Sequence, residues 1–151
     1  MSDSHPPETM DFILANICHL HRARAHQLLE GIGLYRGQTP VLRALWETEG
    51  LTQTELVARM KITPATMTKM LQRMERAGFI YRKPDPADQR VSRVYLTEAG
   101  RAIQHEVEAV WLRMSEETFA NFTPEESALL GQFLLRMRGN LARVTGEALW
   151  K

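Results

Sequence analysis

The sequence is poor in cysteine and has no long apolar segment. Cys18 is the single cysteine among 151 residues, so an internal disulfide is excluded and a reducing, cytoplasmic environment is expected. No apolar run approaches the ~20 residues that a membrane-spanning helix requires, and the polar, acidic start MSDSHPPETMD does not resemble a signal peptide. We therefore expect a cytoplasmic protein without a membrane partner.

The sequence also lacks the patterns of known catalytic and metal sites. It has no phosphate-binding loop, nucleophile elbow or complete catalytic constellation, so an enzyme is not expected. HEVEA at residues 105–109 begins like a zinc-protease motif but has Ala109 where the second histidine belongs. His19 and His21 are two positions apart on a predicted helix and point in different directions, which disfavours joint chelation. We predict no metal site and no cofactor.

Net charge is low for the whole chain but high in its middle. The total is +1, whereas residues 51–93 contain nine basic and four acidic residues, which gives this segment +5 and leaves −4 for the rest. A basic middle suggests a local site for a polyanion. A solvated charged surface explains the same charge equally well.

Apolar residues make up 44% of the chain, which is enough for a core, and their spacing predicts mostly helices. Residues 1–9 look like a flexible tail. A helix is expected from Met10 to Glu30, where glycines end it. A second helix should begin near Thr39-Pro40, with proline in its first turn, and stop at Gly50.

The next segment, LTQTELVARMKITPATMTKMLQRMERAG, predicts two short helices joined by a tight turn. Thr52 and Glu55 form a capping box at the start of the first helix. Lys61-Ile62 makes the turn, and Thr63 caps the second helix, whose first residue is a proline. Gly78 ends it.

Two strands over residues 79–83 and 91–96 predict a hairpin with a long tip. Thr97 caps a helix that runs to about residue 120, and the TPEE motif begins a last helix that runs to about residue 148. This order predicts a mostly α fold with a small β-hairpin wing, the winged helix-turn-helix.

The terminal helices are longer than a small core needs. Two-fold pairing with a second copy is the simplest way to cover their apolar residues. We therefore predict a homodimer, with residues 10–36 and 98–151 as dimerisation helices and residues 37–97 as the winged helix-turn-helix DNA-binding domain. The residues that most need this cover are Leu130, Phe133, Leu134, Met137 and Leu141.

Residues 51–100 resemble the multiple antibiotic resistance regulator (MarR) family of bacterial and archaeal transcription factors. Directly after the helix-turn-helix stand the residues that carry the resemblance most specifically, Asp88-x-Arg90, Val94, Leu96, Thr97 and Gly100. The resemblance implies a homodimer in which the terminal helices pair. It also implies that the helix at 63–77 enters the major groove of DNA and that the wing tip reaches the minor groove.

The resemblance also assigns roles to single residues. By position, Arg90 looks like the family's wing arginine, and Asp88 like the acid that helps to fix the wing. Lys61 stands in the turn where the family often has glycine, a departure that bears on the turn's backbone angle and adds a cation near the phosphates. The expected DNA contacts are Lys61, Thr63, Thr66, Thr68, Lys69, Arg73 and Arg90.

The chemistry of these side chains leaves alternatives open. Lys69 and Arg73, four residues apart, project from one helix face and suit either a guanine or the phosphates. The threonines suit phosphates or a thymine methyl, or else serve only as caps and solvated side chains. Arg90 suits a narrow minor groove, or else pairs with Asp88 and nothing more.

Many relatives lose DNA affinity when a small aromatic or amphipathic acid binds between their domains. The candidates for such an effector site here are His19, Arg36 and Trp46. Trp46 also fits a core position, and Arg36 also fits a solvated one. Cys18 lies about seven residues from the place of the peroxide-sensing cysteine in some relatives, so we interpret it as a packing residue.

We expect a ligand-responsive homodimeric repressor that binds a pseudo-palindromic operator with half-sites ~34 Å apart. A winged-helix module that binds protein and no longer binds DNA is the alternative from another class. An enzyme or a redox sensor with a reactive Cys18 is the third.

Overall fold

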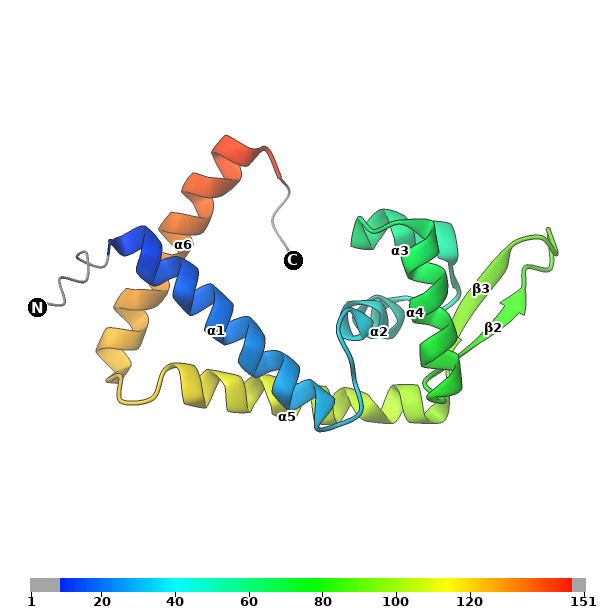
Figure 1. Ribbon diagram of the computed structural model, residues 1–151, viewed down its shortest axis with the longest axis horizontal. Coiled ribbons are helices and arrows are strands. Elements are labelled where there is room, and N and C mark those ends of the chain that lie inside the picture. Colours follow the sequence, from blue (N-terminus) through cyan, green and yellow to red (C-terminus); the bar gives the residue numbers. More distant parts are fainter. Residues whose placement is uncertain (1–8, 148–151) are drawn as a thin grey trace, which may run out of the picture. The chain divides into compact units, whose positions relative to one another are not determined.

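The computed structural model describes residues 9–147 (Figure 1). The expected tail, except for Thr9, and the chain from residue 148 on lie outside the described residues. The chain forms two compact units that meet within one helix, between Met114 and Ser115. The elements are α1 (Met10–Glu30), α2 (Gln38–Glu47), β1 (Leu51–Thr52), α3 (Gln53–Met60), α4 (Pro64–Arg76), β2 (Ile80–Pro84), β3 (Ser92–Leu96), α5 (Glu98–Thr118) and α6 (Pro124–Thr145).

The first unit confirms the predicted fold class, a mostly helical winged helix-turn-helix. Figure 1 shows α4 beside the β2–β3 hairpin. The core gathers residues from α2, α3, α4, β3 and the neighbouring helices, and water is excluded from its largest side chains. These are Leu34, Leu42, Leu45, Leu56, Met67, Leu71, Met74 and Leu96. Burial of this kind stabilises by roughly 1.5–3 kcal/mol per large apolar side chain.

The sheet contains one strand that the sequence did not predict. Its order is β1-β3-β2, all antiparallel, with Leu51 opposite Val94 and Tyr81 opposite Tyr95. β1 has two residues, too few to show the alternation that marks a strand, and it exists only because β3 offers a free edge. Helix α1 has the expected bounds, and most other boundaries differ from the expected ones by one to a few residues, as the ends of elements commonly do.

The start of α5 explains the glycine in the TEAG motif. The side chain of Thr97 accepts from the amide of Gly100 at 3.0 Å and donates to the carbonyl oxygen of Gly78 at 2.5 Å. A Cβ added at Gly100 would lie 2.0 Å from the carbonyl oxygen of Phe79, so no larger residue fits without a backbone shift. The carbonyl of Gly100 also accepts from the Trp46 indole at 2.8 Å. Gly100 therefore joins the wing, α2 and α5.

The second unit contains α6, which begins at a capping box as predicted. Thr123 accepts from the Glu126 amide at 3.2 Å, and the Glu126 carboxylate accepts from the Thr123 amide at 2.9 Å. None of the residues of α6 is buried. Its exposed apolar side chains include Leu129, Phe133, Leu134, Leu135, Met137, Leu141 and Val144, whereas Leu130 is half-buried.

The N-terminal part of α1 is exposed in the same way. Phe12, Ile17 and Leu20 are all more than half exposed, and Cys18 beside them is exposed as well. Cys18 is therefore exposed and not a buried packing residue, in contrast to our interpretation, and the apolar residues Ile17 and Leu20 beside it are exposed as well. None of the described helices is long and apolar enough to cross a membrane.

Candidate nucleic-acid interface

Helix α4 presents one apolar and one polar face. Thr63 caps it by accepting from the Thr66 amide at 3.2 Å, and Pro64 occupies its first turn. Met67, Leu71 and Met74 are buried on the inner face. The residues exposed on the other faces are Pro64, Ala65, Thr66, Lys69, Gln72, Arg73 and Arg76. The helix therefore directs a polar surface that carries three cations away from the core.

The turn between α3 and α4 has the backbone that normally favours glycine. Lys61 adopts φ 52° and ψ 40°, the left-handed conformation, and its amide donates to Val57 at 2.9 Å. This conformation costs a non-glycine residue roughly 1–2 kcal/mol. The turn accommodates lysine at that cost, and the exposed side chain lies just before α4 in the chain.

The three threonine hydroxyls take part in hydrogen bonds within the protein. Those of Thr63 and Thr66 pair at 2.8 Å and are exposed. That of Thr68 donates to the carbonyl oxygen of Pro64 at 2.9 Å and accepts from the Gln53 amide at 2.6 Å. Thr68 is thus bonded across to α3 and half-buried, whereas Thr63 and Thr66 bond to each other and are exposed.

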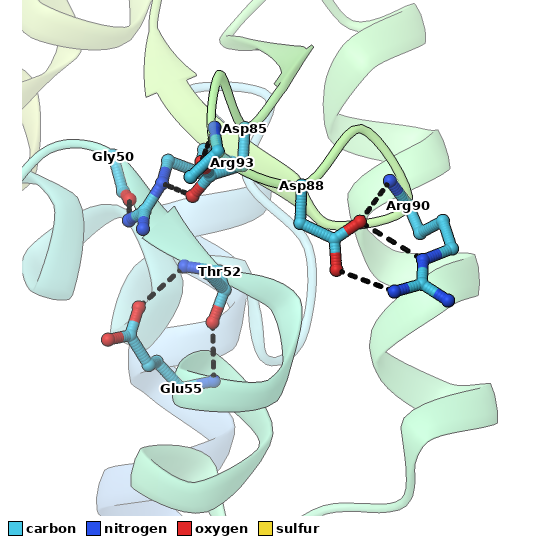
Figure 2. A network of polar contacts seen from close by, with 8 residues as sticks. Gly50, Thr52, Glu55, Asp85, Asp88, Arg90 and Arg93 are labelled. Atoms are coloured by element: carbon cyan, nitrogen blue, oxygen red, sulfur yellow. Dashed lines mark hydrogen bonds and ion pairs between the residues drawn. The ribbon is translucent and has the colours of Figure 1, made fainter.

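The wing tip holds Arg90 against Asp88 (Figure 2). Nε and Nη2 of Arg90 lie 3.1 and 3.3 Å from the two carboxylate oxygens, and the backbone amide of Arg90 donates to the same carboxylate at 3.1 Å. These bonds, the side-chain ones first, lower the pKa of Asp88. The Arg90 side chain remains 91% exposed, so the pairing does not withdraw it from solvent.

The base of the wing contains a second carboxylate–arginine pair, which the sequence did not reveal. Asp85 is only 9% exposed, and its Oδ2 lies 2.6 Å from Nε of Arg93. Nη1 of Arg93 donates to the carbonyl oxygen of Gly50 at 2.7 Å, which ties the hairpin to the segment before β1 (Figure 2). Asp85 also accepts from the amide of Ala87 at 2.7 Å. Only the strand register, with Lys83 opposite Arg93, places the pair together.

These contacts shift the pKa values of the charged side chains at the base of the wing. The Ala87 amide and then Arg93 lower the pKa of Asp85, while Asp85 raises the pKa of Arg93. Nearby, Arg82 of β2 binds Glu75 of α4 at 2.6 Å, which raises the pKa of Arg82. The Arg82–Glu75 pair fixes the wing to α4, the Asp85–Arg93 pair braces the wing base, and neither pair adds to the outer charge of the wing.

The remaining cations of residues 51–93 are differently placed. Among the described residues, six of the nine basic side chains in this segment form no ion pair with an acid: Arg59, Lys61, Lys69, Arg73, Arg76 and Lys83. Three of them lie on α4, and Lys83 stacks on Tyr81 in the wing. The acidic side chains of residues 51–93 are thus largely engaged in contacts within the winged helix-turn-helix, and the unpaired charges on its surface are mostly positive.

The predicted effector residues do not share a described site. His19 and Arg36 are exposed, and no hydrogen bond joins either of them to Trp46 within residues 9–147. Trp46 is half-buried and bonded to Gly100, as its core alternative implied. An open groove of about 380 Å³ lies between the end of α1 and α5, and its lining includes Gln27, Leu28, Ile32, Glu106, Val110 and Arg113 but none of the three candidates. No group of three or more potential metal ligands gathers in the described part of the chain.

Comparisons with known proteins give the same result as the geometry. A model of the MarR family matches residues 34–92. The chain is 33% identical over 125 residues to the transcriptional regulator HosA of Escherichia coli O111:H-, which covers 82% of this chain and 90% of that protein. It is 30% identical over 112 residues to the uncharacterised HTH-type transcriptional regulator YdgJ of Bacillus subtilis, over 74% of this chain and 68% of YdgJ.

Solved structures agree over most of the chain. A MarR-like transcription regulator from Bacillus cereus superposes with a TM-score of 0.71 at 28% identity, covering 85% of this chain and 92% of that one. A mutant of MepR from S. aureus gives a TM-score of 0.80 at 25% identity, covering 88% and 98%. The cationic α4 and the wing thus belong to a DNA-binding regulator and not to an enzyme. The chain belongs to the MarR family of winged helix-turn-helix transcriptional regulators.

Proposed function

We propose that the protein is a cytoplasmic, ligand-responsive homodimeric repressor that binds a pseudo-palindromic operator. The observation that carries the proposal is the joint exposure of Lys69 and Arg73 on α4 and of Arg90 at the wing tip. A helix of this kind fits the major groove, and an exposed arginine on a narrow loop fits the minor groove. Lys61, Thr63 and Thr66 would add contacts to the phosphates at the start of α4.

The dimer would place two winged helix-turn-helix units on one face of the DNA. We assign residues 10–36 and 98–151 to dimerisation and residues 37–97 to DNA binding. Support comes from the exposed apolar side chains of α1 and α6, which a second copy would cover. The predicted contact residues are Leu130, Phe133, Leu134, Met137 and Leu141, and half-sites ~34 Å apart would follow from the two-fold axis.

A small aromatic or amphipathic acid would act as the effector. It would bind better to the dimer conformation in which the two recognition helices do not match the operator spacing. The population of dimers would then shift away from the DNA-binding conformation. His19, Arg36 and Trp46 remain the predicted contacts, with the exposed His19 and Arg36 as the groups able to meet a carboxylate.

The proposal is tested by selecting bound sequences from genomic fragments and then measuring affinity for the selected duplex against salt. We expect the affinity to fall steeply as salt rises, because phosphate contacts release counterions. A negligible slope, or no enrichment of any duplex, contradicts the proposal and favours a winged-helix module that binds protein.

The role of Arg90 has its own test. Arg90→Ala should weaken binding to the selected duplex by about tenfold, since one base or groove contact is worth roughly 1–3 kcal/mol, and should leave the dimer intact. Arg138→Ala, which removes the same charge from an exposed position on α6, is the control. Equal losses in the two variants would show that only total charge matters.

A further inference from the structure

Helices α3 and α4 are joined by a side-chain hydrogen bond that the proposed DNA contacts do not account for. Gln53 is the first residue of α3, and its Nε2 donates to Oγ1 of Thr68 at 2.6 Å and to the carbonyl oxygen of Pro64 at 3.4 Å. The hydroxyl of Thr68 donates to the same carbonyl at 2.9 Å. Three groups from two helices therefore close on one another.

The direction of each bond follows from the number of protons. A threonine hydroxyl carries one proton, and that of Thr68 is directed at the Pro64 carbonyl, so the hydroxyl can only accept from Gln53. The Pro64 carbonyl also only accepts, which requires the amide nitrogen of Gln53, and not its oxygen, to face the pair. Thr68 consequently has no proton left for a phosphate oxygen or a base acceptor.

Thr66, on the same helix, differs from Thr68 because its hydroxyl group can still donate a hydrogen bond to DNA. Its hydroxyl pairs with that of Thr63 at 2.8 Å, and both side chains are exposed. Two hydroxyls hold two protons, and one bond uses only one of them, so the other can turn to a phosphate. Thr68, by contrast, is half-buried, and its single hydroxyl proton is donated to the Pro64 carbonyl oxygen.

We infer that Gln53 is a positioning residue for DNA reading, which acts through Thr68 to hold α4 in a fixed place on α3, and that Thr68 is its acceptor and not a phosphate contact. This inference rests on the proposed function. Lys69 follows Thr68 directly, and Arg73 is one turn further on the exposed face. A shift of α4 against α3 would move both away from the base edges, whereas phosphate contacts by long cationic side chains tolerate it.

The test is a double-mutant cycle in the full-length protein. Gln53→Met and Thr68→Val each remove one partner at nearly constant volume, and the readout is the ratio of affinities for the selected duplex and a scrambled one at the same salt. Each single variant should lower this ratio about fivefold, which corresponds to one lost hydrogen bond. The double variant should lower it no further than either single one, because the two residues act as a unit.

Thr54→Val, an exposed neighbour of Gln53 on α3, is the matched control and should leave the ratio unchanged. Thermal melting and dimer mass verify folding, and Gln53→Asn, whose amide is one methylene too short to reach Thr68, replaces Gln53→Met if that variant is unstable. An unchanged ratio in the Gln53 variant overturns the inference. Losses that multiply in the double variant overturn it as well.

An equal loss on both duplexes with a shallower salt slope also overturns the inference, because it would mean that Gln53 holds a phosphate directly. A wild-type protein that selects no duplex contradicts the proposed function itself. The two failures are therefore distinguishable.

Discussion

The winged helix-turn-helix and helix α6 differ in the burial of their apolar residues. In the winged helix-turn-helix, the inner faces of α2, α3, α4 and β3 are removed from water, and several side chains there are fully buried. In α6 no residue is buried, although leucine, phenylalanine and methionine side chains recur along it and its capping box is complete. The start of α6 thus carries a complete local signal, whereas cover for its apolar side chains is what the proposed second copy would supply.

The largest expected effect is loss of the partner. Leu134→Asp places a carboxylate on the exposed apolar face of α6 and should weaken dimerisation by about 100-fold or more, since an unpaired charge in an apolar contact costs several kcal/mol. DNA affinity should fall with it. Sedimentation velocity and DNA binding measure the two effects.

Gln132→Asp, which adds the same charge at an exposed polar position of α6, is the control for that variant. A stable, DNA-competent Leu134→Asp dimer would show that this face does not form the interface.

The second test applies one substitution to both regions. Gly100→Ala should destabilise the protein by about 2–3 kcal/mol, because the new Cβ would lie 2.0 Å from the Phe79 carbonyl oxygen. Gly131→Ala in α6 meets no atom within 4 Å and should stabilise by roughly 0.5–1 kcal/mol through helix propensity. Urea unfolding of both variants measures the difference. Destabilisation by Gly131→Ala would place that position against the partner.

The third test separates the base of the wing from its tip. Arg93→Met removes the link from Asp85 to Gly50 and should speed amide exchange in the wing and weaken DNA binding about fivefold, because a looser wing must be ordered on binding. Arg90→Ala should weaken DNA binding with little change in exchange, since Arg90 is almost fully exposed. Identical exchange in the two variants would contradict the distinction.

The smallest expected effect is the dependence of the wing on pH. Because hydrogen bonds lower the pKa values of Asp85 and Asp88 in the folded chain, their stabilising contribution is present above the ordinary value of 3.8 and is lost as pH falls through the lowered values. Amide exchange at Ala87 and Arg90, followed by NMR below pH 3.8, should show protection disappearing.

Asp88→Asn is the control for the pH test and should abolish the pH response at Arg90 while Ala87 retains it. Protection that persists in the wild type after both carboxyl groups have been protonated would contradict this assignment.

Much of the fold could be predicted because its signals are local. Thr52, Thr63 and Thr123 each cap the helix that the sequence assigned to them, and two of these caps are complete boxes. The hairpin, the mostly helical class and the MarR resemblance followed from spacing and motif over a few dozen residues. Physical contacts within three or four positions of one another suffice for such features.

The features that were missed join residues far apart in the chain. β1 depends on a free edge of β3, Arg93 reaches Gly50 across 43 positions, and Gln53 reaches Thr68 across 15. Asp88 was chosen as the acid that fixes the wing, but Asp85 is the more buried of the two. No local pattern distinguishes them, because burial is decided by what packs over each residue.

The sequence by itself determined where helices begin, which face of each is apolar, and that the middle of the chain, residues 51–93, is basic. Tertiary structure decided which charges remain available, since packing pairs Arg82 and Arg93 with acids and leaves Lys69 and Arg73 exposed. It also decided that Gly100 must be glycine. Capping and periodicity act within a turn of helix, whereas ion pairing and steric exclusion depend on which surfaces meet in the folded chain.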